Sequence, residues 1–465
     1  MTGLTLFEKL WRQHLVADVD ESSGLLLIDR ILLHERTGGV ALRSLAEAGH
    51  RVMAPGQVFA TMDHVVDTLP GRSDVTLMPT GTAFITALRE EANANAIRLF
   101  DIGDPGQGIV HVISPEQGIV LPGLTLVCAD SHTCTQGALG ALAWGIGSSE
   151  AEHALATGTL RVRKPKTMRV TIDGTLGTGV TAKDLALFLL ARFGANGARG
   201  HIVEFAGEVI RAMPIEARMT LCNLATEFSA FSAIIAPDDS TITYFEGRRF
   251  APTGEEWDRA AAMWRTFVSD ADAVFDAELA IDAGEVPVMV TWGTNPEQAT
   301  AIGGVVPAGS ERRGADAHAR SLAYMAIEPG QPLGQLAIDA AFIGSCTNSR
   351  LSDLQRAAAI LRGRHVAPGI RAICVPGSTE VKRQAEAAGL DAVFRAAGFE
   401  WRESGCSICF FAGGESFGAE ERVISTTNRN FESRQGPMTR THLASPEVVA
   451  ASAITGRITD PRELI

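Results

Sequence analysis

The sequence predicts an α/β protein, because short apolar segments typical of strands alternate with helical segments in each region of the chain. The alternation is clearest where the apolar run at residues 337–343 ends in a small-residue turn and is followed by a helical segment at 351–362. It recurs where a strand-like run at residues 168–172 precedes a helical segment at 182–193. At 465 residues, the chain is long enough for two or three domains with their own cores.

The order of these segments predicts three α/β domains. The first covers residues 1–165, and a short basic, proline-containing linker at 164–166 leads into the second at 166–285. A third apolar run begins near Val286, so the last domain is placed at 286–465.

Within these domains the individual elements differ in clarity. The first domain is expected to contain helices at residues 8–14, 82–95 and 148–160. The acidic stretch at 237–282 has no regular pattern and receives no assignment, whereas the Gly-, Pro- and Ser-rich segment at 303–317 predicts an exposed loop. The glycine-rich segment at 137–147 has the composition of a phosphate loop, but the chain contains no Gly-x-x-x-x-Gly-Lys-Ser/Thr motif. Close backbone packing is the better interpretation of these glycines.

Composition excludes several classes of protein. The net charge of -13 disfavours a nucleic-acid or anionic-membrane partner, since those partners require a basic face. No apolar run reaches the roughly 18 residues of a membrane span, and the N-terminus lacks the pattern of a signal peptide. Seven cysteines, an odd number spread over a long chain, argue against a disulfide framework and for the reducing cytoplasm.

One cysteine is expected in a turn between a strand and a helix. The run Ala-Phe-Ile-Gly-Ser-Cys-Thr-Asn-Ser-Arg at residues 341–350 ends its apolar part abruptly. Asn348 and Ser349, together with Asp353, supply N-cap chemistry for the helix that follows. Cys346 would then lie where outward-pointing N–H groups favour negative charge, which suits a thiolate bound to metal.

A Cys-x-x-Cys pair, Cys406 and Cys409, follows further along the chain. Taken alone it is compatible with a thioredoxin-like redox pair, half of a zinc site or two unrelated core thiols. A structural zinc site usually needs a second short-spaced pair, and the chain has none; a redox pair is typical of a small unit rather than a long chain. Three thiolates without a fourth suggest an iron–sulfur cluster with one open iron.

Two carboxylate–imidazole pairs and a third histidine are candidates for proton transfer. Asp63 directly precedes His64, and Asp130 lies two residues before His132. A carboxylate bonded to one ring nitrogen fixes the tautomer and raises the basicity of the other nitrogen. His111 follows an apolar run. For any one histidine, a packed or capped side chain is the simpler interpretation.

Two further pairs have spacings that allow them to serve one ligand. Asn223 and Glu227 are four residues apart, which predicts that they share one helical face. Arg429 and Arg434 flank Phe431, and guanidinium groups bind carboxylates in a bidentate manner. A solvated helix face and a solvated surface loop are the alternative interpretations.

Several segments together resemble the aconitase superfamily, nearly end to end, and within it the large-subunit branch of the isopropylmalate dehydratases. The matching motifs are Phe-Ala-Thr-Met-Asp-His at 59–64, Gly-Ile-Val-His at 108–111, Ala-Asp-Ser-His-Thr at 129–133, Val-Thr-Trp-Gly-Thr-Asn-Pro at 290–296, Phe-Ile-Gly-Ser-Cys-Thr-Asn-Ser at 342–349, Gly-Cys-Ser-x-Cys at 405–409 and Thr-Asn-Arg-Asn-Phe-Glu-x-Arg-Gln-Gly at 427–436. The resemblance implies an aconitase-like fold in which three α/β domains surround one 4Fe-4S cluster per chain.

The resemblance also implies roles for individual residues. The cluster ligands would be Cys346, Cys406 and Cys409, leaving one iron open. The implied catalytic residues are Asp63, His64, His111, Asp130, His132 and Glu227. The implied substrate-binding residues are Ser131, Asn223, Arg429 and Arg434, and the residues next to the cluster are Asn348 and Asn428. Four cysteines match no ligand position and are expected to be core thiols: Cys128, Cys134, Cys222 and Cys374.

The activity implied by the resemblance is that of a cluster-dependent hydro-lyase. It would isomerise a 2-alkylmalate through an alkene, most simply 2-isopropylmalate to 3-isopropylmalate through 2-isopropylmaleate in leucine biosynthesis, with His64 protonating the departing hydroxyl. The segment at 410–416 and the pair Val423-Ile424 depart from the dehydratase pattern, which leaves open another 2-hydroxydiacid of the 2-methylmalate (citraconate) or homoaconitate type.

A separate small subunit is the expected partner. Family members made as one polypeptide carry a further domain that supplies the serine base, and this chain ends about thirty residues after the 427–436 motif. We therefore expect the chain to require a small subunit for turnover. The remaining alternatives are an RNA-binding iron sensor, which the acidic net charge disfavours, and a zinc or disulfide protein with structural cysteines.

Overall fold

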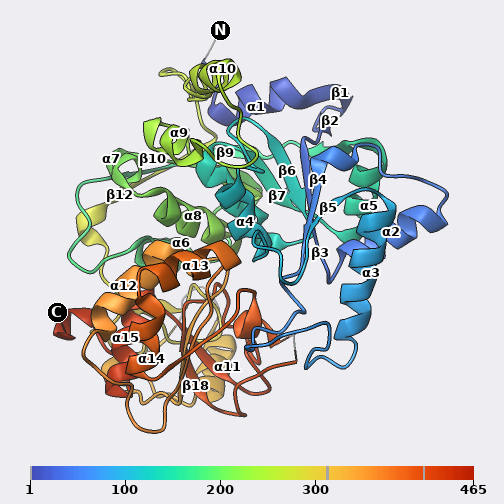
Figure 1. Cartoon of the computed structure of the whole chain (residues 1–465). Helices are drawn as coiled ribbons and strands as arrows, with labels where there is room; N and C mark the ends of the chain where they lie inside the picture. Colours follow the sequence, from blue (N-terminus) through green and yellow to red (C-terminus); the bar gives the residue numbers. More distant parts are fainter. Residues whose placement is uncertain (1–2, 310–313, 412–413, 465) are drawn as a thin grey trace. The chain divides into compact units, whose positions relative to one another are not determined.

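The computed structural model describes residues 3–309, 314–411 and 414–464. The chain divides into two compact units, each assembled from separate segments (Figure 1). Unit 1 contains Met1–Asp63, Thr82–Gly174 and Ala198–Asp282, and unit 2 contains His64–Gly81, Thr175–Gly197 and Ala283–Ile465. The proposed division into domains at 1–165, 166–285 and 286–465 is a different partition, and it stays a prediction.

A five-stranded parallel sheet forms the first half of unit 1. Its strand order is β5-β4-β3-β6-β7. The strands are β3 (Arg30–His34), β4 (Val58–Thr61), β5 (Arg98–Phe100), β6 (Thr125–Cys128) and β7 (Leu142–Gly145). β4 and β6 are buried along their whole length, as expected for parallel strands covered on both faces. The accompanying helices are α2 (Gly38–Glu47), α3 (Gly81–Ala94), α4 (Val110–Gln117) and α5 (Ser148–Thr157), with short 3-10 segments η1 (Pro55–Gln57) and η2 (Ser131–Leu139).

A second, four-stranded parallel sheet completes unit 1. Its order is β11-β10-β9-β12, with β9 (Lys166–Asp173), β10 (His201–Ala206), β11 (Ser232–Ile234) and β12 (Ala277–Asp282). Its helical segments are α7 (Glu208–Ala212), α8 (Ile215–Leu224), η3 (Ala225–Phe228), α9 (Asp239–Phe245) and α10 (Glu255–Trp264). The unassigned stretch at 237–282 therefore holds two helices and a sheet strand. Asp238 begins α9 as an N-cap, a short-range signal that the acidic composition concealed.

The N-terminal segment adds a small antiparallel sheet to unit 1. Helix α1 (Leu6–His14) begins with a capping box between Thr5 and Glu8 and is followed by β1 (Leu15–Asp20) and β2 (Ser23–Leu27). β2 also pairs with β8 (Thr159–Arg163). The predicted helix at 148–160 was too long at its end, because α5 stops before Gly158, whose φ of 65° forms a left-handed C-cap.

Unit 2 is built on another five-stranded parallel sheet, in the order β17-β16-β15-β18-β19. The strands are β15 (Ala340–Ile343), β16 (Arg371–Cys374), β17 (Phe399–Trp401), β18 (Arg422–Ser425) and β19 (Arg440–Leu443). Helices α12 (Leu351–Leu361), α13 (Thr379–Ala387), α14 (Leu390–Ala397) and α15 (Pro446–Thr455) accompany it. A hairpin of β13 (Met289–Thr291) and β14 (Ala299–Ala301), and the segments α6 (Ala182–Phe193), α11 (Ala315–Met325), η4 (Ala283–Glu285), η5 (Leu333–Gln335), η6 (Ser407–Cys409) and η8 (Pro461–Leu464), complete the unit.

Two local expectations in unit 2 need correction. The loop predicted at 303–317 gives way to helix α11 from Ala315, and its positions 310–313 lie outside the described residues. Helix α12 begins at Leu351, as predicted, but its N-cap is Arg350 and not Asn348 or Ser349, and Asp353 accepts the Arg350 N–H at 3.1 Å. The earlier residues cannot serve as N-cap because they form the turn around Cys346, whose carbonyl accepts a hydrogen bond from Arg350 Nη1 at 3.0 Å.

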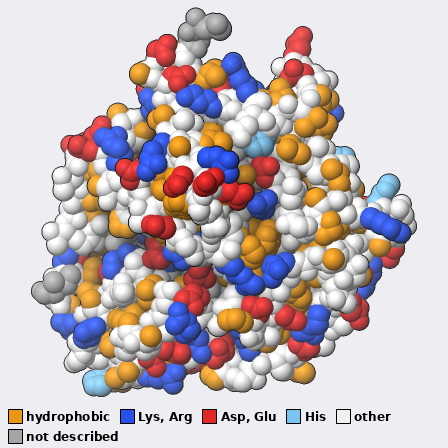
Figure 2. Space-filling model, turned by 45° about the horizontal axis from the view of Figure 1, so that its top comes forward, with side chains coloured by type: hydrophobic (Ala, Val, Ile, Leu, Met, Phe, Trp, Pro, Cys, Tyr) orange, Lys and Arg blue, Asp and Glu red, His pale blue; other side chains and the backbone are white. Residues whose placement is uncertain are grey.

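Among the described residues, no helix combines the length and the hydrophobicity that a membrane span requires. Figure 2 shows Lys and Arg side chains interspersed with Asp and Glu over the face in view.

The glycine-rich segment confirms the expectation of close backbone packing. A Cβ atom added to Gly137 would lie 1.8 Å from the carbonyl oxygen of Ala233, and one added to Gly145 would lie 2.6 Å from the carbonyl oxygen of Asp130. These contacts leave no room for a side chain at Gly137 or at Gly145, the last residue of β7.

Replacing Gly137 with alanine is expected to destabilise the protein by about 1–3 kcal/mol, because the new methyl group displaces backbone rather than a mobile side chain. The change is measured as a lower midpoint of denaturant unfolding. Gly56→Ala is the matched control, since a Cβ there meets nothing within 4 Å. Equal midpoints for the two variants would contradict the packing argument.

Candidate active site

The first group of functional side chains follows three neighbouring strands of the unit 1 sheet. His34 is the last residue of β3, Asp63 comes two residues after β4, and Asp130 comes two residues after β6. These strands are parallel and adjacent in the order β4-β3-β6, so their carboxyl ends meet at one edge of the sheet. Ligand sites of parallel α/β sheets form at this edge.

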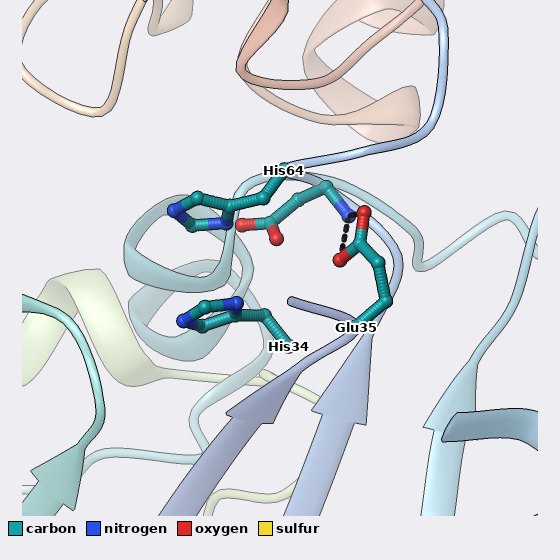
Figure 3. A group of neighbouring side chains, drawn as sticks. His34, Glu35 and His64 are labelled. Atoms are coloured by element: carbon teal, nitrogen blue, oxygen red, sulfur yellow. Dashed lines mark hydrogen bonds between the residues drawn. The ribbon is translucent and has the colours of Figure 1, made fainter. Parts of the chain in front are cut away.

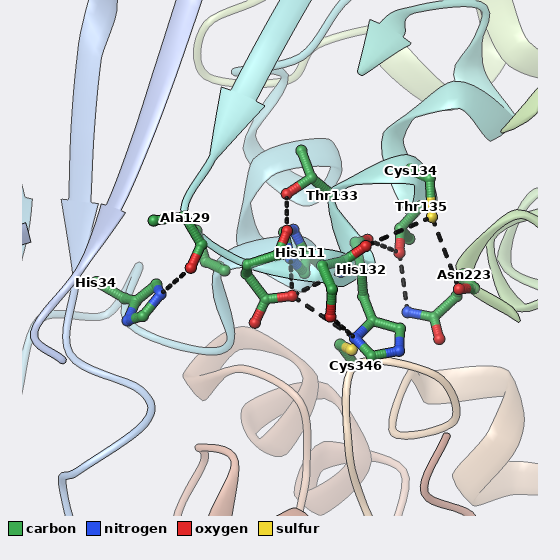
Figure 4. A network of polar contacts seen from close by, with 12 residues as sticks. His34, His111, Ala129, His132, Thr133, Cys134, Thr135, Asn223 and Cys346 are labelled. Carbon is green, nitrogen blue, oxygen red and sulfur yellow. Dashed lines mark hydrogen bonds and ion pairs between the residues drawn. The ribbon is translucent and has the colours of Figure 1, made fainter. Parts of the chain in front are cut away.

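Asp130 contacts two imidazoles, those of His111 and His132, which are labelled in Figure 4. Its Oδ1 lies 3.1 Å from His111 Nε2 and 3.6 Å from His132 Nδ1, and it also accepts the His132 backbone N–H at 2.7 Å. On the other side of the His132 ring, Nε2 lies 3.0 Å from Glu227 Oε1. Both imidazoles are at least 95% buried. We call Asp63, His111, Asp130, His132 and Glu227 the imidazole–carboxylate group.

Asp63 fixes the helix that carries His111. Its Oδ2 accepts the N–H of Val110, the first residue of α4, at 2.8 Å. A carboxylate is favourable at this position because the free N–H groups of a helix start carry partial positive charge. The N–H of Asp63 in turn donates to both carboxylate oxygens of Glu35, at 3.1 and 3.0 Å (Figure 3). His64, the next residue, is half-buried and opens the first segment of unit 2.

The single α-helix expected to carry both Asn223 and Glu227 is interrupted between them. Helix α8 ends at Leu224, and Glu227 lies on the 3-10 segment η3. The fully buried Asn223 donates from Nδ2 to Thr135 Oγ1 at 2.9 Å, while Glu227 contacts His132. The tighter winding after Leu224 rotates Glu227 away from the register that a spacing of four has in an α-helix. Both residues nevertheless contact η2, the 3-10 segment that carries His132.

Three residues near this group were not predicted from the sequence. His34 contacts the carbonyl oxygen of Ala129 through Nε2 at 3.3 Å (Figure 4), Glu35 holds the Asp63 amide, and Gln136 Nε2 lies 3.4 Å from His111 Nδ1. The sequence could have indicated His34 and Glu35, because both lie directly at the end of the apolar strand β3. Ser131, which was predicted, is exposed and places Oγ 3.3 Å from His132 Nδ1.

The second group of functional side chains belongs to unit 2 and follows strands of its sheet. Cys346 comes three residues after β15, Asn428 comes three residues after β18, and Cys406 and Cys409 follow β17. We call Cys346, Cys406 and Cys409 the cysteine group. Cys346 and Cys409 are buried, and Cys406 is half-buried. The strand-to-turn placement predicted for Cys346 is confirmed.

Polar groups point at two of the three sulfur atoms. Asn428 Nδ2 lies 3.5 Å from Cys346 Sγ, Arg434 Nη2 lies 3.7 Å from Cys409 Sγ, and Ser345 Oγ lies 3.1 Å from Cys409 Sγ. The Asn428 and Arg434 donors stabilise the thiolate form, which is the form that binds metal.

The backbone beside these residues is unusual. Ser345, Ser407 and Ser433 have φ values of 82°, 50° and 64°, in the left-handed region that residues other than glycine rarely adopt. Ser345 precedes Cys346, Ser407 follows Cys406 and Ser433 precedes Arg434. Such conformations cluster at functional sites because the surrounding structure must maintain them. Their sequence signal is weak, since serine tolerates many conformations.

The two arginines predicted to bind substrate differ in their surroundings. Arg434 is 8% exposed, and its guanidinium packs on the rings of Phe410, at 4.7 Å, and Phe431, at 5.2 Å. Arg429 is half-buried. Phe410 belongs to the atypical 410–416 segment, of which residues 412–413 lie outside the described part of the chain. Asn348, also predicted, donates from Nδ2 to Asp353 at 3.1 Å.

A buried lysine beside the cysteine group was not predicted. Lys183 is fully buried on α6, and its Nζ donates to the carbonyl oxygens of Thr426 at 2.9 Å and Thr427 at 2.5 Å. Burial lowers the pKa of Lys183 to about 7, against the opposing pull of Cys409, Asp353 and Cys346. Burial likewise raises the pKa of the neighbouring Asp184 carboxyl.

The residues of the cysteine group fit an iron–sulfur cluster. Thiolates are the ligands that these clusters require. Within the described residues, Asn428 Oδ1 and Arg434 Nε are buried polar atoms without a hydrogen-bond partner, so the group retains polar capacity beside its sulfurs. The other four cysteines are buried, and burial raises the pKa of the Cys222 and Cys374 thiols well above the usual value. Their prediction as core thiols is confirmed.

Comparison with known proteins gives matches to a family, to a relative and to a solved structure. A model of the family described as Aconitase family (aconitate hydratase) matches residues 8–456. The chain is 53% identical over 467 aligned residues to 3-isopropylmalate dehydratase large subunit 1 of Bradyrhizobium diazoefficiens, an alignment that covers 99% of this chain and 97% of the relative. Among solved structures, the holo form of Thermococcus kodakaraensis aconitase X aligns with a TM-score of 0.46 and 14% identity, covering 91% of this chain and 89% of that chain.

Replacing Cys409 with serine is expected to abolish iron binding, because serine does not supply a thiolate to the cysteine group. Iron and acid-labile sulfide are measured after anaerobic reconstitution. Cys374→Ala is the control, since it removes a fully buried thiol that lies within β16. Full iron content in Cys409→Ser would remove this residue from the ligand set.

Replacing Glu227 with glutamine is expected to lower kcat/KM by about 100-fold, because the amide no longer orients the His132 ring as the carboxylate does. The measurement is kcat/KM with a 2-alkylmalate. The exposed Glu246, replaced in the same way, is the control. An unchanged kcat/KM in Glu227→Gln would refute the role given to the 3.0 Å contact.

Proposed function

The chain belongs to the aconitase family, and we propose that it is the large subunit of a 3-isopropylmalate dehydratase, a hydro-lyase that converts 2-isopropylmalate to 3-isopropylmalate through 2-isopropylmaleate in leucine biosynthesis. The observation that carries the proposal is the 53% identity over 99% of the chain to a relative of that name. The cysteine group and the imidazole–carboxylate group supply the residue chemistry that the reaction needs.

The proposed cofactor is one 4Fe-4S cluster held by Cys346, Cys406 and Cys409. When bound, such a cluster with one open iron supplies a Lewis acid that weakens the C–O bond of the substrate hydroxyl. Three cysteine ligands leave that open position, and Asn428 and Arg434 direct hydrogen-bond donors to two of the sulfurs. An odd number of cysteines, seven, agrees with a reducing cytoplasm as the proposed compartment.

The imidazole–carboxylate group is proposed to hold and move protons. Asp130 orients His111 and His132, since both rings lie near one of its carboxylate oxygens. Glu227 fixes the tautomer and orientation of His132 from the opposite ring nitrogen. His64 is the proposed donor that protonates the departing hydroxyl.

Arg434 and Arg429 are proposed to bind the two carboxylates of the substrate. Packing between Phe410 and Phe431 restricts the guanidinium of Arg434, so little side-chain entropy remains to be lost when it binds a carboxylate. Asn223 and Ser131 are proposed to contribute hydrogen bonds to the same diacid.

A small subunit is the proposed partner, supplying the base that removes the α-proton and the remaining substrate contacts. The relative is itself named a large subunit. No role in nucleic-acid binding is proposed, because the net charge is -13 and basic side chains alternate with acidic ones on the face in Figure 2.

A second candidate is the same reaction on another 2-hydroxydiacid, of the 2-methylmalate or homoaconitate type. The observation that favours it is the contact between Phe410, in the atypical 410–416 segment, and Arg434. A change of side chain against a substrate-binding arginine alters the shape of the space beside it.

The test is turnover by the reconstituted chain mixed with a small subunit of the family. We expect activity with 2-isopropylmalate, none from the chain alone, and absorbance in the visible blue region from the anaerobic protein. Parallel assays with 2-methylmalate and homoaconitate identify the second candidate. A colourless, zinc-loaded chain would overturn the proposal. Activity from a chain that mass spectrometry shows to contain no partner would overturn it as well.

A further inference from the structure

Lys183 is a buried charge that the proposed reaction does not use. It is the second residue of α6, and its side chain is fully buried in unit 2. Placing an ammonium group in a protein interior costs several kcal/mol unless other groups compensate it. The compensation here comes from the carbonyl oxygens of Thr426 and Thr427, at 2.9 and 2.5 Å.

The two carbonyls belong to the segment that presents Asn428. Thr426 and Thr427 directly follow β18, and the next residue places Nδ2 3.5 Å from Cys346 Sγ. A lysine that holds both carbonyls therefore restrains the backbone immediately before a side chain that contacts a cluster ligand.

The same segment is locked to the turn that carries Cys346. Thr426 Oγ1 donates to the carbonyl oxygen of Gly344 at 2.8 Å and accepts the N–H of Gly344 at 2.9 Å. It also lies 3.3 Å from the carbonyl oxygen of Asn348. Cys346 sits between these two attachment points. Displacement of Thr426 would therefore move the turn on both sides of the cysteine.

The charge of Lys183 also suits its surroundings. Its electrostatic partners are the thiols of Cys409 and Cys346 and the carboxyls of Asp353 and Asp184, and the thiols lose their protons when they bind a metal. Thiolates favour the charged form of Lys183, and an ammonium group beside them stabilises the thiolates and favours electron-rich states of a bound metal centre.

We propose that Lys183 is a positioning residue for the iron–sulfur cluster, holding the Thr426–Thr427 backbone against the Cys346 turn and placing a positive charge beside the cluster thiolates. This inference rests on the proposed function, because it takes the cysteine group to bind a cluster.

The test compares Lys183→Met with wild type and with Lys382→Met. The control removes the same charge from a lysine of unit 2 that pairs with Glu403 at 2.8 Å. The readouts are the rate of iron loss to a chelator and the reduction potential of the reconstituted cluster. In Lys183→Met we expect iron loss to be about 10-fold faster, as for loss of other groups that support metal ligands. The potential should become more negative, because a cation that favours the reduced cluster is gone. The control should match wild type in both.

Lys183→Gln keeps a hydrogen-bond donor without the charge. It replaces Lys183→Met in the comparison if the methionine variant does not fold. Wild-type chelator kinetics and potential in a folded Lys183 variant would overturn the inference. Failure of both variants to fold, judged by circular dichroism before reconstitution, would also overturn it, because Lys183 would then serve the fold in general. A wild-type chain that takes up no cluster would refute the proposed function instead.

Discussion

Parallel pairing of strands is the constraint on which both functional groups depend. In a parallel sheet all carboxyl ends lie at one edge, so residues distant in sequence become neighbours without any long-range motif. β4, β3 and β6 bring Asp63, Glu35 and Asp130 together in this way. β15 and β18 do the same for Cys346 and Asn428 in unit 2. The order of the strands in each sheet therefore determines which side chains come together in each group.

Buried charges then fix the groups in place. In unit 1, Asp63 joins β4 to the start of α4, and Asp130 links the two histidines. In unit 2, Asp353 holds both Asn348 and the first turn of α12, while Lys183 restrains the segment after β18. Removing one member of such a pair leaves an uncompensated charge, which costs more than the pair itself contributes. These positions are therefore rigid, because breaking one of these pairs costs free energy.

The sequence predicted features whose cause is local. Helix α6 matches the expected range 182–193, and the turn at Cys346 follows from an apolar run that ends in small residues. What escaped prediction depends on tertiary contacts. The change from α8 to a 3-10 segment moved Glu227, although its spacing from Asn223 is helical. The sequence shows Lys183 only as a lysine at the start of a helix. Its role depends on the segment after β18, whose carbonyl oxygens it contacts. Helices α9 and α10, in the acidic stretch at 237–282, were not predicted. The stretch has no regular pattern, and the N-cap residue Asp238 was not recognised among its acidic residues.

The interleaving of the two units has a consequence for biosynthesis. The chain passes between them at 63/64, 81/82, 174/175, 197/198 and 282/283, so unit 2 is interrupted by residues 82–174 and 198–282. During translation, Lys183 emerges long before Cys409, and the strands that unite them appear last. All three residues of the cysteine group are therefore present only after residue 409 has been synthesised. A truncated product lacking its last sixty residues would keep Cys346 but lose Cys406, Cys409, β18 and β19, and would leave an edge of the sheet exposed to aggregation.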